Sequence, residues 1–122
     1  MPYVINFQET GVIVLLYDVV TRDDFLAAGH EMWGQQNWDK SEYEIVDLSQ
    51  ATSVDISEGF AMEMAHMDNA ASISSRRRKV AIITTNQEII HLAKIYAKFV
   101  KKWKWETEIF KDMDTALQWA TL

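Results

Sequence analysis

The sequence predicts one α/β domain over residues 1–122, in which four helices cover a mainly parallel sheet of five strands. Apolar segments of strand character alternate with segments in which apolar residues recur every three to four positions, as on one face of a helix. The links between these segments are short, which favours right-handed crossovers between neighbouring parallel strands. With 48% hydrophobic and 25% charged residues, the composition is that of a globular domain. The expected element order is β-β-α-β-α-β-α-β-α.

The first third of the chain is expected to form two strands and a helix. Residues 4–7 and 11–17 read as strands joined by a tight turn, in which Gly11 is expected to supply a permissive backbone. The second strand is apolar on both faces, as is typical of a central strand covered by helices. Thr21 is expected to cap a helix over residues 22–36, since acidic residues follow it in the first turn.

The middle of the chain, YEIVDLSQATSVDISEGF over residues 43–60, reads as a strand, a polar loop and the start of a helix. Asp55 is followed three places later by Glu58, which is the spacing of a capping box. We therefore expect Asp55 to cap a helix over residues 56–72. The apolar stripe of that helix is expected to fill the core with Phe60, Met64, Met67 and Ala71.

The last third of the chain is expected to form two further strand and helix pairs. A strand at residues 80–84 precedes a helix capped by Asn86, whose inner face carries apolar residues through positions 89–103. A short strand at 105–110 and a helix capped by Asp112 complete the predicted order.

Composition excludes several classes of protein. The absence of cysteine removes disulfides and thiolate sites. The net charge of −6, divided as −9 over residues 1–60 and +3 over residues 61–122, argues against a general nucleic-acid binder. The longest apolar run, residues 12–17, is far shorter than the roughly 20 residues of a membrane-spanning helix. We expect a soluble, cytoplasmic protein with no integral membrane segment.

The central stretch resembles the STAS domain of the anti-sigma-factor antagonists, which has the SpoIIAA-like fold. Asp47-Leu48-Ser49 matches the end of the strand in that family's pattern, and Asp55 stands where the family has the aspartate before its phosphorylated serine. The end of the chain, KVAIITTNQEIIHLAKIYAKF followed by EIFKDMDTALQWA, is more similar to the uncharacterised bacterial members of the family. Two positions depart from the pattern: Ile56 occupies the place of the regulatory serine, and Asp18 stands where the family often has glycine.

The resemblance implies a non-enzymatic regulatory module that docks a protein partner through the loop and helix start at residues 53–60. An anti-sigma factor or a kinase-like regulator is the partner that the resemblance suggests. Phosphorylation of the next serine along the chain would add about −1.5 to −2 charges beside two acidic residues and release such a partner. The candidate residues for docking or for the switch are Asp47, Asp55, Ile56, Ser57 and Glu58.

Simple structural roles compete with these functional ones. Asp55 at the start of a helix caps it in the usual case, and Asp47 at a strand end often caps the following loop. The basic run at residues 76–79 is typical of a solvated turn, with an anionic patch or a phosphorylation site as the alternative. Trp33 and Trp38 suit a partner or homodimer interface if they are exposed, and burial against the sheet is equally compatible with the sequence.

A second hypothesis is a small-ligand or lipid-binding domain with a pocket between helices and sheet. Residues 94–105 interleave lysine with tryptophan, which is the composition of a membrane-surface contact. The plain alternative is that one tryptophan ends the helix stripe at position 103 and the other packs at the edge of the sheet. This basic and aromatic edge comprises Lys94, Lys98, Lys101, Lys102, Trp103 and Trp105.

The sequence holds no catalytic constellation and predicts neither a metal site nor a cofactor. His30, His66 and His91 fall on three different predicted helices, and the four glycines do not form a phosphate-binding loop. An enzyme that uses Asp47, Asp55 or a histidine remains a third hypothesis, which two convergent titratable groups in a cleft would favour.

Overall fold

The computed structural model describes residues 2–73, 76–100 and 105–122. Its main sheet has five strands in the order β1-β2-β4-β6-β7, where β1 and β2 are antiparallel and every other neighbouring pair is parallel. The strands are β1 (Tyr3–Phe7), β2 (Gly11–Leu16), β4 (Tyr43–Asp47), β6 (Arg78–Ile83) and β7 (Trp105–Phe110). The predicted α/β class with a mainly parallel five-stranded sheet is therefore confirmed.

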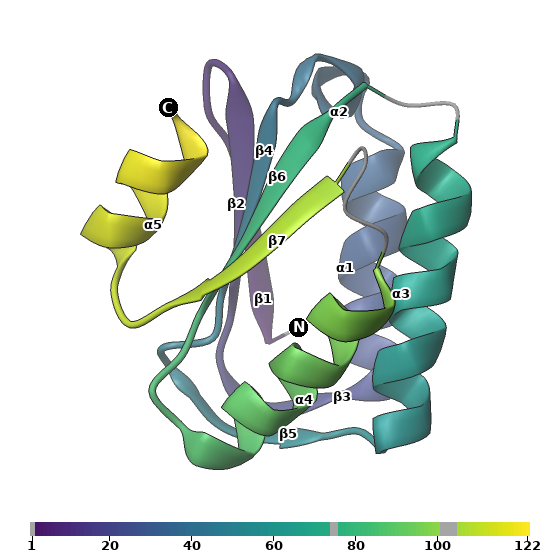
Figure 1. The fold of residues 1–122 in the computed structure, drawn as a ribbon, viewed down its shortest axis with the longest axis vertical. Helices are drawn as coiled ribbons and strands as arrows, with labels where there is room; N and C mark the ends of the chain where they lie inside the picture. The colour runs from purple at the N-terminus through teal and green to yellow at the C-terminus, as the bar shows by residue number, and fades with distance from the viewer. Residues whose placement is uncertain (1, 74–75, 101–104) are drawn as a thin grey trace.

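Helices cover the two faces of this sheet unequally (Figure 1). One face carries α5 (Met113–Ala120) alone, and the other carries α1 (Arg22–Trp33), α3 (Glu58–Ser72) and α4 (Gln87–Phe99). Because successive side chains of a strand point to opposite faces, each central strand contributes to two cores. The larger core lies under the three helices, and the smaller core lies under α5.

Three elements were absent from the predicted order. The strands β3 (Asp18–Thr21) and β5 (Ala51–Asp55) pair with each other in parallel, and the short helix α2 (Gln36–Lys40) follows α1. Strand β5 occupies the stretch that was predicted to be a loop, and the predicted helix over 22–36 ends at Trp33. Such segments of four or five residues carry too little periodicity to be recognised alone, and their pairing depends on tertiary proximity.

Side-chain caps begin most of the longer helices where the sequence places them. Thr21 and Asp24 form a reciprocal capping box, and Asn86 and Asp112 accept hydrogen bonds from the first turns of α4 and α5. The exception is α3, because its cap is Ser57, whose hydroxyl accepts a hydrogen bond of 3.0 Å from the amide of Phe60. The predicted cap Asp55 is wrong, since this residue is the last of β5 and pairs with Thr21.

Two residues at the ends of β2 have unexpected backbone roles. Gly11 does not have a positive φ; it lies in β2 under the ring of Tyr43, where an added Cβ would come within 2.3 Å of the ring. Its predicted function as a permissive turn residue is therefore wrong, and its actual function is to make room for that ring. Asp18, just after β2, has φ of 59°, a left-handed conformation that glycine adopts without steric cost.

The basic run at residues 76–79 is only partly exposed, which corrects the prediction of a solvated turn. Arg78 begins β6 and is buried, with its guanidinium 3.8 Å from the ring centroid of Trp38. It donates hydrogen bonds of 3.1 and 2.9 Å to the carbonyls of Ser41 and Trp38. Trp38 in turn meets Trp105 edge to face at 6.1 Å. A cation can be buried here because the carbonyls and the rings solvate it.

Candidate functional site

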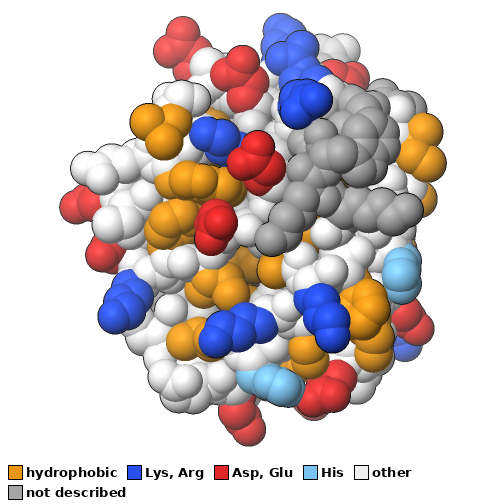
Figure 2. Space-filling view, viewed as in Figure 1, with side chains coloured by type: hydrophobic (Ala, Val, Ile, Leu, Met, Phe, Trp, Pro, Cys, Tyr) orange, Lys and Arg blue, Asp and Glu red, His pale blue; other side chains and the backbone are white. Residues whose placement is uncertain are grey.

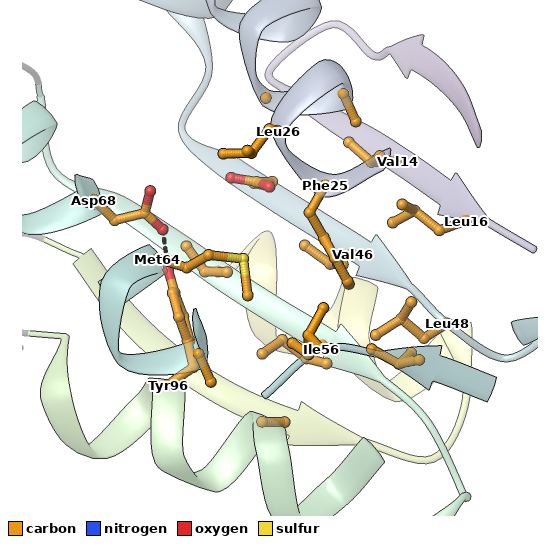
Figure 3. A pocket seen from close by; sticks show the side chains of 18 of the residues that line it. Val14, Leu16, Phe25, Leu26, Val46, Leu48, Ile56, Met64, Asp68 and Tyr96 are labelled. Carbon is orange, nitrogen blue, oxygen red and sulfur yellow. Dashed lines mark hydrogen bonds between the residues drawn. The ribbon is translucent and has the colours of Figure 1, made fainter. Parts of the chain in front are cut away.

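A cavity of about 160 Å³ lies between the main sheet and the helices α1, α3 and α4 (Figure 3). The floor is formed by side chains of β2, β4 and β6 that point toward the three helices. Apolar groups dominate the wall, and they include Val14, Leu16, Phe25, Leu26, Met32, Val46, Leu48, Val54, Ile56, Met64, Met67, Ile82, Ile89 and Leu92. An apolar cavity of about 150 Å³ is large enough to hold a molecule such as benzene.

The cavity exists because small and flexible residues stand where the helices approach the sheet. Gly29 of α1 lines the cavity, and a Cβ added there would meet nothing within 4 Å. Met64 and Met67 of α3 also line it, and the side chain of Met67 is 39% exposed. The prediction that these methionines fill the core holds for Met64, which is partly buried against the larger core, and is wrong for the exposed Met67. Methionine side chains adapt readily to ligands of irregular shape.

Two carboxyl groups and a phenol face this apolar space. Glu44 comes from β4, Asp68 from α3 and Tyr96 from α4. The hydroxyl of Tyr96 donates a hydrogen bond to the carboxylate of Asp68 (Figure 3). Among the residues that the structure describes, the carboxyl of Glu44 makes no hydrogen bond or ion pair.

Burial shifts the proton affinity of all three groups. It raises the pKa of Glu44 to about 8, with a further increase from the nearby charge of Asp68 and a smaller opposing effect of Arg78. Burial also raises the pKa of Asp68 to about 6, against the hydrogen bond from Tyr96, which lowers it. The pKa of Tyr96 lies well above its ordinary value because of burial and the neighbouring Asp68. At neutral pH, therefore, Glu44 is mostly protonated and Asp68 mostly ionised.

The cavity reaches the surface between α1 and α3. Two of its lining residues are exposed there, His30 on α1 and Met67 on α3. Ile56, in the loop between β5 and α3, also lines the space. The loop that was predicted to dock a partner therefore forms part of the cavity wall.

The predicted docking residues fall into two groups. Asp47 accepts a hydrogen bond of 3.0 Å from the amide of Ser49, which is the loop-capping role weighed against a functional one. Asp55, Ser57 and Glu58 are exposed along one short stretch of surface. Glu58 lies 2.6 Å from Nε2 of His91, and this contact joins the first turn of α3 to α4.

The predicted basic and aromatic edge is only partly visible. Lys94 and Lys98 are exposed on α4. Trp105 is 1% exposed and belongs to the larger core, so it is not part of a surface edge. This agrees with the alternative in which this tryptophan packs at the edge of the sheet. The remaining members, Lys101, Lys102 and Trp103, lie outside the described residues.

The tryptophans proposed for an interface lie mostly inside the molecule. Trp38 is buried and Trp33 is half-buried, with their ring centroids 6.2 Å apart. The indole nitrogen of Trp33 is buried and has no hydrogen-bond partner within the described part of the chain. The two tryptophans therefore do not offer an exposed surface for an interface. They pack between α1, α2 and the sheet, which is the alternative that the sequence left open.

In the part of the chain that the structure describes, neither the histidines nor the surface charges form a second candidate site. Over residues 2–73, 76–100 and 105–122, no three side chains of His, Asp or Glu converge as metal ligands. Within the same residues, no helix is both long enough and apolar enough to cross a membrane. Figure 2 shows basic and acidic side chains interspersed over one face, so the opposite charges of the two sequence halves are not segregated there.

Sequence reasoning missed Glu44, Asp68 and Tyr96, although each carried a signal. Glu44 interrupts the apolar run of a predicted strand, between Tyr43 and Ile45. Asp68 follows Met64 by four residues and so shares its helical face, and Tyr96 lies on the inner face of α4. A charged residue at a core position indicates either a buried partner or a site.

No protein-family model matches the sequence, and no curated protein matches it. Among solved structures, one similar chain is an uncharacterised protein of the DUF3478 family from Shewanella loihica PV-4, described as having a SpoIIAA-like fold. The TM-score is 0.62 at 14% identity, over 97% of this chain and 91% of the other.

The chain has a SpoIIAA-like fold. A second solved structure, that of the anti-sigma factor antagonist SpoIIAA in its unphosphorylated form, agrees with this at a TM-score of 0.62. Its identity is 7%, and the match covers 95% of this chain and 94% of that one. At such identities the SpoIIAA-like fold is shared, and the fold alone does not define a function.

Proposed function

We propose that this protein is a binding module that holds a small, largely apolar molecule in the cavity between the sheet and the helices α1, α3 and α4. The observation that carries the proposal is an apolar space of about 160 Å³ into which a few polar groups converge. Ligand-binding sites in proteins are typically apolar hollows of this kind, in which a few polar groups fix the orientation of the ligand. The fit is to a molecule about the size of benzene rather than to a whole lipid.

The arrangement of the walls supports the proposal. The cavity has an exposed rim between α1 and α3, which gives a ligand a way in. Met64 and Met67 lie on the wall and can repack around different shapes. Filling empty apolar space restores dispersion contacts that its lining otherwise lacks, so a ligand of suitable size gains affinity without new hydrogen bonds.

The test is an NMR titration of protein labelled at the methionine methyl groups, with benzyl alcohol as the probe. We expect the Met64 and Met67 signals to shift with a Kd on the order of 1 mM, which lies well within the ceiling on affinity for so small a ligand. Gly29→Leu should abolish these shifts because its side chain fills the cavity. Gly59→Leu, at an exposed position of α3 outside the cavity, is the matched control and should bind as the wild type does. Equal shifts in Gly29→Leu and the wild type, or none in either, would contradict the proposal.

A second candidate function is the docking of a protein partner through residues 53–60, as the resemblance to the anti-sigma-factor antagonists suggests. One observation favours it beyond the fold. Ile56 lines the cavity while its neighbours Asp55, Ser57 and Glu58 are exposed, so this stretch joins the ligand space to the surface. A ligand in the cavity would then change the surface presented to a partner.

Partner docking is tested with a double variant that keeps α3 capped. Asp55→Ala with Ser57→Asn removes the acidic group and the hydroxyl, while asparagine still caps the helix. We expect loss of a partner that the wild type captures from host extract, with Glu108→Ala, an exposed acid of β7, as the control. Unchanged capture by the folded double variant would exclude this surface.

A further inference from the structure

The geometry points to a small apolar amine as the ligand class of the cavity, held with its ammonium group between the carboxyls of Glu44 and Asp68. This inference rests on the proposed function and names the chemistry that the same site selects. Such a molecule has an apolar body of about benzene size and one cationic head.

The two carboxyls reach the cavity from different elements. Glu44 rises from strand β4 on the floor, and Asp68 comes from the wall formed by α3. They are close enough for the charge of one to disfavour ionisation of the other. A cation between them would be attracted by ionised Asp68 and would favour the ionised form of Glu44, and both effects are strong in a poorly solvated space.

The neighbouring groups do not already neutralise this pair. On β6, the cation whose charge acts on Glu44 is Arg78, which donates hydrogen bonds to the carbonyls of Ser41 and Trp38 and whose Nη1 has no hydrogen-bond partner among the described residues. On α4, the hydroxyl of Tyr96 already donates its hydrogen bond to Asp68. On α1, the lining side chain with a titratable group is His30, which is exposed at the rim. Among the described residues, the carboxyl of Glu44 therefore has no direct ion pair, and the positive charge of Arg78 only partly offsets the effect of burial on it.

The same carboxyl groups disfavour ligands that carry a carboxylate or a hydroxyl in place of the ammonium group. A ligand carboxylate would bring another negative charge beside Asp68 and would have to be desolvated without a cationic partner, which is costly. A neutral hydroxyl can accept a hydrogen bond from protonated Glu44 or donate one to Asp68, so it binds without the electrostatic gain. The expected order of affinity is amine, then alcohol, then carboxylate.

Binding of an amine should also move a proton. Glu44 is mostly protonated at neutral pH, and a cation beside it favours the ionised form, so its proton passes to the solvent when the ammonium binds. The affinity for an amine should therefore rise with pH between about 6 and 8, while the affinity for a carboxylate falls.

The experiment compares benzylamine, benzyl alcohol and benzoate, which share one apolar body, by NMR titration and calorimetry at pH 6, 7 and 8. At pH 7 we expect benzylamine to bind at least about tenfold more tightly than benzoate, with proton release detected by calorimetry in buffers of different ionisation enthalpy. Glu44→Gln and Asp68→Asn should each reduce this preference severalfold and leave benzyl alcohol bound. Glu63→Gln, at an exposed acid of α3, is the control and should keep the preference.

The outcomes separate this inference from the function on which it rests. If benzyl alcohol binds in the cavity but benzylamine binds no more tightly than benzoate, the amine is excluded and the binding module stands. If the preference survives in both Glu44→Gln and Asp68→Asn, the two carboxyls do not form the amine site. If none of the three probes binds, the cavity is not a ligand site and both proposals fall.

Discussion

The two faces of the main sheet differ in how closely the helices pack against them. Under α5, Tyr43 covers Gly11, Ile45 is 0% exposed, and Ala116 and Ala120 let the helix approach closely. Under α1, α3 and α4, the same strands border a cavity of about 160 Å³ that contains two carboxyl groups. Strand β4 shows the contrast within consecutive residues, since Ile45 belongs to the tight core and Glu44 and Val46 line the cavity.

This difference separates stability from function within a single sheet. On the α5 face, small helix residues and the strand side chains that they meet are almost completely buried, as in an ordinary protein interior. On the opposite face, the cavity lacks packing contacts and the carboxyl groups are buried. Both features lower the stability of the folded state. Proteins accept such costs mainly at functional sites, which is why the looser face is the one to which we assign binding.

The largest expected effect comes from truncating adjacent isoleucines of β6 that point to opposite faces. Ile83→Ala, in the tight core, should lower the free energy of unfolding by about 4 kcal/mol, and Ile82→Ala, on the cavity wall, by about 2 kcal/mol. The chemical change is identical, so the difference reports how many packing contacts each side chain makes. Urea denaturation measures both, and equal losses would mean that the two faces are equally well packed.

The next effect is a dependence of stability on pH that belongs to the cavity face. The folded pKa of Glu44 is raised from 4.5 to about 8, so between these values the folded protein holds a proton that the unfolded chain has released. Stability is therefore greatest below pH 4.5 for this group and falls as the pH rises toward 8. Relative to Glu44→Gln, the wild type should lose roughly 3–4 kcal/mol between pH 5 and 9.

Urea denaturation of both proteins across this range measures the difference, so that contributions from other groups cancel. Asp68→Asn is a second control, because the raised pKa of Asp68, about 6, confines its own contribution to the lower part of the range. Parallel pH profiles of the wild type and Glu44→Gln would show that Glu44 does not hold its proton in the folded state.

A smaller loss is expected when a methyl group is added to the tight face. Gly11→Ala places a Cβ 2.3 Å from the buried ring of Tyr43, and moving that ring should cost about 2 kcal/mol. In a Tyr43→Leu background the clash is absent, so the same substitution should cost less than half as much. A double-mutant cycle by thermal or urea unfolding checks this, and additive losses would rule out the Tyr43 contact as the cause.

The smallest effect has the opposite sign and lies on the cavity face. Gly29→Ala adds a Cβ where nothing lies within 4 Å and improves the helix propensity of α1, so it should stabilise the protein by about 0.5–1 kcal/mol. A rise in the midpoint of urea unfolding is the expected readout. Destabilisation by this substitution would mean that the space beside Gly29 is filled.

Much of the fold follows from patterns that are local in the chain. The apolar run of β2, the helical stripe of α4 and the caps Thr21, Asn86 and Asp112 each reflect propensities that neighbouring residues set. The prediction of Asp55 as a cap went wrong because a capping spacing is also compatible with a strand end. The choice was decided by pairing of Asp55 with Thr21 across the small sheet, a contact far apart in sequence.

The sequence by itself determined the α/β class and the order of its principal elements, since these rest on periodicity and short-range capping, and its Asp47-Leu48-Ser49 and Asp55 carried the resemblance to the SpoIIAA-like family. Only the tertiary structure decided that Arg78 is solvated by Trp38 inside the core, and that Glu44, Asp68 and Tyr96 converge on one cavity. The physical reason is that burial, and with it the pKa of a carboxyl, depends on how closely whole helices pack on the sheet. No local pattern encodes that distance.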